Sequence, residues 1–122
     1  MRDPHFIYVI SATIDGPCKL GISAAPDKRV RQLQTGHAHP LTVYHRQPLA
    51  AERVAYYEKL VHRDNREKRL TGEWFRMSVA DAIAYVQFTV IQYDSLTIDG
   101  LKKALGQKYC SYAALTIDDG LV

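Results

Sequence analysis

Three polar side chains that could handle phosphate stand in the first quarter of the chain. Tyr8 lies in a short apolar run, Lys19 lies in the next run, and Arg29 follows ten residues later. The Asp15-Gly16 pair between the two runs is typical of a hairpin turn, so the runs should form adjacent antiparallel strands. We therefore expect a phenol, an ammonium and a guanidinium to converge on one surface suited to phosphate.

A carboxylate interrupts the apolar stripe of a predicted helix. Val54 and Val61 bracket Glu58 at helical spacing, so Glu58 should point toward the sheet, with His62 one turn later on the same side. A buried carboxylate is costly unless it is paired or bound to a metal ion. Glu58 is therefore expected either to pair with another group or to bind a metal ion. For His62 three roles stay open: metal ligand, general base or partner of Glu58.

The spacing of apolar residues, turns and helix caps predicts the elements that position these side chains. Strands are expected over residues 5–12, 18–23, 41–47 and within 72–77, and helices over 26–35, 49–65, from Ser78 onward and over 96–105. The pattern indicates an α+β fold with a small three-stranded antiparallel sheet flanked by helices. Residues 1–77 would form the core, and residues 78–122 a helical C-terminal extension packed on it.

Length and charge limit the possible functions. The 122 residues, 47% of them hydrophobic, suffice for one domain with a single core. The net charge of +3 divides into +5 for residues 1–77 and −2 for residues 78–122, which favours a polyanionic partner for the first part. The basic residues expected to contact nucleic-acid phosphates are Lys28, Arg31, Arg63, Arg66 and Arg69.

No apolar run approaches the ~20 residues that a membrane span needs, so no membrane association is expected. Cys18 and Cys110 lie far apart without metal-ligand spacing, which predicts two free thiols in a cytoplasmic protein.

The ordered set of these residues resembles the GIY-YIG endonuclease family, in its phage and bacterial branch, over about residues 5–77. The matching pieces are Phe6-Ile7-Tyr8, Lys19-Leu20-Gly21, Arg29, Glu58 with His62, and Gly72-Glu73-Trp74-Phe75. The resemblance implies metal-dependent hydrolysis of DNA phosphodiester bonds on a small α+β domain, with RNA still open as a substrate.

The resemblance also implies roles for single residues. Tyr8 would activate or orient the attacking water, Arg29 would bind the scissile phosphate, and Glu58 would hold a divalent cation, Mg²⁺ or Mn²⁺. Mg²⁺ prefers oxygen ligands from one or two carboxylates together with substrate phosphate. Lys19 could bind phosphate or, together with Arg29, bias Tyr8 toward the phenolate form.

Two departures from the family pattern favour an alternative. Lys19 stands where the second motif has a tyrosine, and the asparagine expected after the glutamate helix has no clear match, since Glu73 and Trp74 occupy that region. The alternative is a DNA-binding or regulatory module that keeps the fold with weak or absent catalysis. A more distant alternative is a protein-interaction domain that assembles through its C-terminal helices. A homodimer, or a partner protein that supplies specificity, is compatible with either.

Overall fold

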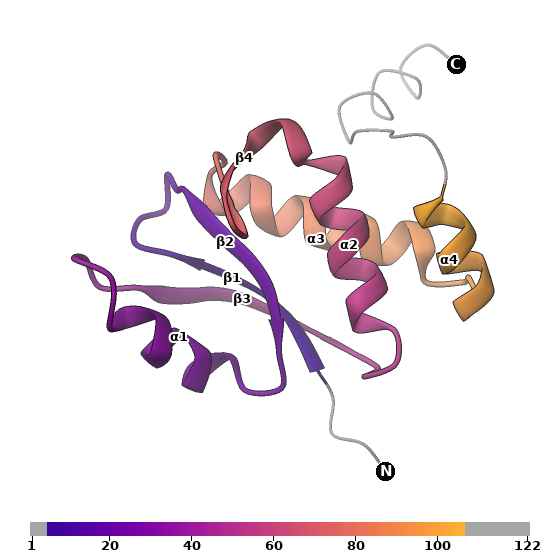
Figure 1. The fold of residues 1–122 in the computed structure, drawn as a ribbon, viewed down its shortest axis with the longest axis horizontal. Coiled ribbons are helices and arrows are strands. Elements are labelled where there is room, and N and C mark those ends of the chain that lie inside the picture. Colours follow the sequence, from indigo (N-terminus) through magenta and orange to yellow (C-terminus); the bar gives the residue numbers. More distant parts are fainter. Residues whose placement is uncertain (1–4, 107–122) are drawn as a thin grey trace.

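The computed structural model describes residues 5–106, and Figure 1 shows the arrangement of its elements. The elements are β1 (His5–Ser11), β2 (Cys18–Ser23), α1 (Pro26–Gln34), β3 (Thr42–Leu49), α2 (Val54–Asp64), the 3-10 helix η1 (Arg66–Lys68), β4 (Arg69–Thr71), β5 (Trp74–Phe75), α3 (Val79–Tyr93) and α4 (Ile98–Leu105). The predicted α+β class is confirmed. No helix in residues 5–106 is both long and apolar enough to cross a membrane.

The sheet has five strands in the order β3-β1-β2-β5-β4, and every pairing is antiparallel. The predicted three-stranded sheet is therefore too small. β5 lies within the strand expected in residues 72–77, but its place in the sheet was not predicted. β4 was not predicted, because three residues are too few for an alternating pattern to show in the sequence. Gly72, with φ of 55°, makes the turn that joins β4 to β5.

The two faces of the sheet carry different side chains. Ile7 and Val9 of β1 belong to the main buried cluster with residues of α2 and α3, whereas α1 contacts the other face (Figure 1). Successive side chains of a strand point to opposite faces, so Tyr8 lies on the α1 face. Tyr8 is only 1% exposed, so α1 and the sheet enclose its ring.

The boundary between β3 and α2 lies later than expected. β3 continues through Pro48 to Leu49, and α2 begins at Val54 rather than near residue 49. Proline is tolerated in β3 because this strand lies at the edge of the sheet. A bulge opposite Val9 and Ile10 also breaks the alternation expected for residues 41–47, so Val43 and His45 face opposite sides.

The helices after residue 77 begin at side-chain caps. The Ser78 hydroxyl accepts a hydrogen bond of 3.1 Å from the Asp81 backbone N–H, as the sequence predicts. α3 and α4 contribute to the same buried cluster as the sheet, with Val86 and Leu101 fully buried. The division at residue 77 stays a prediction. Cys110 and the rest of residues 107–122 lie outside the described part of the chain, whereas Cys18 is a buried free thiol.

Candidate active site

Gly21 allows Tyr8 to lie directly against β2. The two residues are opposite each other in the β1–β2 register. A Cβ added to Gly21 would overlap the hydroxyl of Tyr8 and would lie 2.9 Å from Oε1 of Glu73. The Tyr8 hydroxyl and the Glu73 carboxylate therefore meet over the backbone of Gly21, where only glycine leaves room.

In the described part of the chain, β2 lacks a strand partner along part of one edge, and helix α2 supplies polar groups there. β5 pairs only with Cys18 and Lys19 of β2. At the next residue, the Leu20 backbone N–H donates to the Glu73 carbonyl oxygen at 3.0 Å, and its carbonyl accepts from Nε2 of His62 at 2.8 Å. This edge brings side chains from α2 and the β4–β5 hairpin to the face that carries Tyr8.

Glu58, His62 and Glu73 form the candidate metal-binding group at this edge. One potential ligand atom from each lies within 4.8 Å of the other two, and all three residues are half-buried. Among residues 5–106, Oε2 of Glu58 is buried and has no hydrogen-bond partner. An orphaned buried carboxylate oxygen beside a second carboxylate is the environment that a hard divalent cation would satisfy.

The Glu58 carboxyl resists ionisation in the absence of a cation. Burial raises its pKa to about 7, and the negative charge of Glu73 adds to the rise. Lys19 and Lys59 act in the opposite direction but do not offset these effects. Two carboxyls so close together hold a proton near neutral pH unless a cation neutralises them.

His62 is held as a neutral imidazole. Because a carbonyl oxygen only accepts, Nε2 must carry the proton donated to Leu20, so in the neutral ring Nδ1 carries the lone pair. Burial lowers the pKa of His62, although the Leu20 bond partly opposes this. The ring also packs 5.0 Å from that of Phe75. Nδ1 can therefore accept a proton or bind a cation.

Tyr8 is a neutral phenol, contrary to the expected bias toward phenolate. Burial raises its pKa, and the charges of Glu73 and Glu58 add to the rise. Hydrogen bonding with Arg29 lowers the pKa but does not outweigh them. The sequence identifies Lys19 and Arg29 as nearby cations but does not show that Glu58 and Glu73 lie close enough to raise the pKa of Tyr8.

Lys19 lies beside Glu73 rather than opposite Tyr8. Its Cα partner on β1 is Ile10, and its Nζ is 3.4 Å from Oε1 of Glu73. The same Nζ lies 5.8 Å from the ring centroid of Trp74. Lys19 is thus a buried cation between the acidic group and an aromatic residue.

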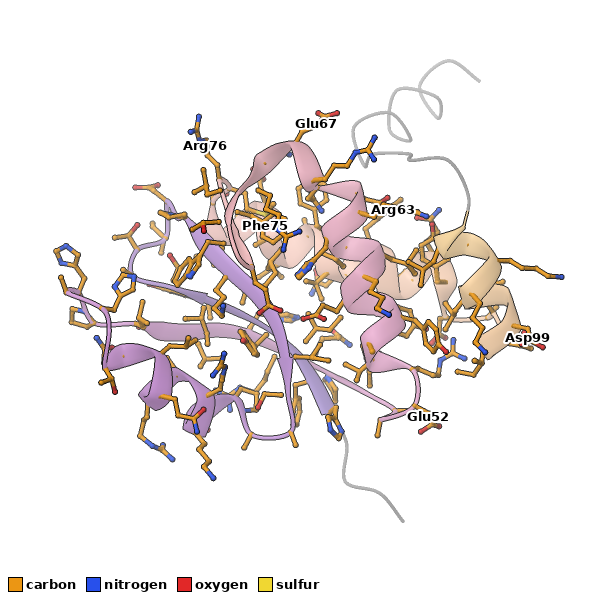
Figure 2. All side chains as sticks on the ribbon, in the orientation of Figure 1. Glu52, Arg63, Glu67, Phe75, Arg76 and Asp99 are labelled. Carbon is orange, nitrogen blue, oxygen red and sulfur yellow. The ribbon has the colours of Figure 1, made fainter. Side chains whose placement is uncertain are left out.

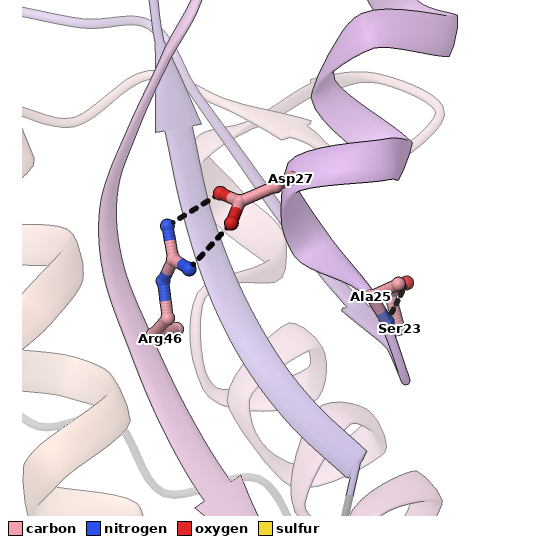
Figure 3. A network of polar contacts seen from close by, with 4 residues as sticks. All are labelled: Ser23, Ala25, Asp27 and Arg46. Atoms are coloured by element: carbon pink, nitrogen blue, oxygen red, sulfur yellow. Dashed lines mark hydrogen bonds and ion pairs between the residues drawn. The ribbon is translucent and has the colours of Figure 1, made fainter.

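Helix α1 brings Arg29 to Tyr8, and a solvent-exposed ion pair links the start of the helix to the sheet. Asp27, at the start of α1, receives two hydrogen bonds from Arg46 of β3, of 3.0 and 2.7 Å (Figure 3). Arg46 lies on the same face as Tyr8, its Cα partner. This bidentate contact orients the turn of α1 from which Arg29 projects.

The basic residues expected on a nucleic-acid surface separate into two groups. Lys28 and Arg31 are exposed on α1, and Arg66 and Arg69 are exposed near the β4–β5 hairpin. The side chain of Arg63 is only 16% exposed, and it bonds to Asp64 at 3.1 Å and to the Ala104 carbonyl. Figure 2 shows Arg63 between α2 and α4, so we assign it to packing of α4 and remove it from the proposed surface.

Glu73 is the site residue whose role the sequence did not reveal. It stands in the short segment after Gly72 where the family pattern led us to look for an asparagine. Its proximity to Glu58 depends on the pairing of β5 with β2. The sequence feature that could have indicated this role is the position of Glu73 directly before the aromatic pair Trp74-Phe75.

The antiparallel sheet and the flanking helices define a small α+β domain, with a cluster of polar side chains at the β2 edge. The chain belongs to the T5orf172 domain family, which it matches over residues 5–90. This is a phage-associated domain related to GIY-YIG and HNH-type nuclease-like folds. No curated protein and no solved structure matches the chain.

Proposed function

We propose that the protein is a metal-dependent endonuclease that hydrolyses phosphodiester bonds of DNA. The observation that carries this proposal is the meeting of Tyr8, Arg29 and the Glu58–Glu73 pair at one edge of β2. The T5orf172 match supports a nuclease-like or DNA-binding role for the same segment.

The residues present fit a divalent cation. Glu58 and Glu73 would hold Mg²⁺ or Mn²⁺ through carboxylate oxygens, with a ring nitrogen of His62 as a further donor for Mn²⁺. When bound, the cation would offset charge that develops on the phosphate and lower the pKa of a bound water.

The chain's own residues supply the remaining functions. Arg29 presents a permanent positive charge and a planar set of donors suited to two phosphate oxygens. Tyr8 keeps its proton, because burial raises its pKa and the charges of Glu73 and Glu58 add to the rise, so it would orient a water or a phosphate oxygen by hydrogen bonding. Nδ1 of His62 can take a proton, and Lys19 restrains the Glu73 carboxylate.

The test is cleavage of supercoiled plasmid DNA by the full chain with Mg²⁺ or Mn²⁺. Glu58→Gln and Arg29→Ala should each lower the rate by about 100-fold or more, because each removes a charge aimed at the reacting phosphate. Glu52→Gln, which alters an exposed acid just before α2, should cleave like the unaltered protein.

Two results would overturn the proposal. Cleavage that survives both site variants would assign the activity elsewhere. Salt-sensitive DNA binding without product, whatever divalent cation is present, would instead support the DNA-binding or regulatory module. The substitution of Lys19 for a tyrosine of the family pattern favours that second candidate.

A further inference from the structure

An apolar pocket lies next to the candidate active site. Its volume is about 290 Å³, just below the range of ~300–1,000 Å³ for small-molecule pockets. The loops after β1 and α1 and the β4–β5 hairpin form its walls. The lining residues are Ala12, Pro17, His37, Leu70, Thr71 and Trp74.

Two aromatic rings form the most distinctive part of the wall. The rings of Trp74 and His37 lie 5.5 Å apart between centroids, at an interplanar angle of 31°. Leu70, which is 46% exposed, adds an apolar side. Flat aromatic surfaces that remain open to solvent are what single-stranded nucleic acids use for stacking of unpaired bases.

Lys19 joins this pocket to the candidate active site. Its Nζ lies 5.8 Å from the Trp74 ring and 3.4 Å from the Glu73 carboxylate. The register also places Trp74 directly opposite Lys19, on the sheet face that carries Tyr8. A strand whose phosphate lies at the cationic groups would thus have a base within reach of the pocket.

We infer that the pocket beside Trp74 receives one unstacked nucleobase of the strand bound at the active site. The inference rests on the proposed function and extends it to the substrate class. The geometry selects DNA with an unpaired or easily unstacked base, because a base inside a regular duplex cannot reach the pocket without leaving its stack.

Trp74 is the single tryptophan of the chain, so its fluorescence reports on the pocket directly. The probe is a single-stranded oligonucleotide of about 12 nucleotides, within the ~4–16 that small single-strand-binding domains cover. With EDTA present to prevent cleavage, we expect it to quench the fluorescence and an oligonucleotide of abasic residues to leave it nearly unchanged. Equal quenching by both, or none by either, would overturn the inference.

Variants separate stacking from charge. Trp74→Leu should weaken binding of the normal oligonucleotide about 5- to 150-fold, measured by anisotropy of a labelled strand, and change binding of the abasic strand little. His37→Ala keeps the reporter and should reduce both affinity and quenching. Ile91→Ala removes a side chain that is 78% exposed on α3 and serves as the control. Equal losses for both strands in the Trp74 and His37 variants would contradict a base pocket.

The two proposals fail separately. Base-dependent quenching without cleavage would support the base pocket and contradict the endonuclease proposal. Cleavage that depends on Glu58, together with base-independent quenching, would support the endonuclease proposal and contradict the base pocket.

Discussion

Gly21 determines how closely Tyr8 can approach β2. The register places these residues opposite each other, and the missing side chain provides the space where the phenol and the Glu73 carboxylate meet. The glycine therefore has a steric function, although it contributes no reactive group.

Gly21→Ala should damage the site through this contact. The added methyl would push against a fully buried tyrosine, so we expect a loss of about 1–3 kcal/mol in the free energy of unfolding. Cleavage should fall by a larger factor than the folded fraction. Gly36→Ala is the matched control, because a Cβ there has no atom within 4 Å. Urea unfolding of both variants measures the difference, and equal stability would contradict the contact.

Glu58 should make stability depend on pH and on divalent cations. Its pKa of about 7 in the folded state exceeds the ordinary value of 4.5, so the folded chain binds the extra proton. The stability from this proton is fully present below about pH 4.5 and is lost as the pH rises through about 7. Without a cation, thermal unfolding should show this loss, and Glu58→Gln should reduce it.

Added Mg²⁺ should reverse the effect where the carboxylate is ionised. We expect a larger increase in unfolding temperature at pH 8 than at pH 5.5, because proton and cation compete for the same group. Glu58→Gln should abolish the increase, and Glu52→Gln should retain it. An increase that is independent of pH, or that survives Glu58→Gln, would place the cation elsewhere.

The position of α4 against α2 gives Arg63 a structural role that its basic neighbours do not share. Arg63 lies in the same basic run as Arg66 and Arg69, yet its guanidinium contacts the Ala104 carbonyl of α4. The sequence alone gives the charge of each residue but not the position of α4, so Arg63 could not be distinguished.

Arg63→Met should therefore affect stability and leave nucleic-acid binding unchanged. Loss of hydrogen bonds from a charged donor should cost about 1.5–3 kcal/mol in the free energy of unfolding. Arg31→Met, on the exposed surface of α1, should have the opposite effects. Denaturant unfolding and DNA titration of both variants provide the comparison. Weaker DNA binding by a stable, folded Arg63→Met variant would indicate that Arg63 does contribute to the nucleic-acid-binding surface.

Patterns within single elements predicted much of the fold. Alternating apolar residues and the Asp15-Gly16 turn were sufficient for β1 and β2, and Ser78 correctly marked the start of α3. Contacts between distant segments were harder. The sequence indicated a short strand within residues 72–77 but not its partner, and the pairing of β5 with β2 brings Glu73 to Glu58. The pKa direction of Tyr8 was missed for the same reason, since it depends on burial and on acids from other elements.

The charge distribution of the whole molecule predicts which face binds a polyanion. If α1 contacts phosphates, the double variant Lys28→Gln/Arg31→Gln should reduce the slope of log affinity against log salt by about 2, or about 1 per contact. The double variant Lys102→Gln/Lys103→Gln removes the same charge from exposed positions on α4 and should leave the slope unchanged. Equal reductions would indicate a general charge effect without a defined face.

Cooperation between Tyr8 and Glu58 in one site is tested most directly by the cleavage rates of Tyr8→Phe, Glu58→Gln and the double variant under Mg²⁺. Residues that act as a unit show strongly non-additive losses. We predict that each single variant loses about 100-fold or more, and that the double variant loses little more than the worse single one. Losses that multiply, or full activity in either single variant, would contradict a shared site.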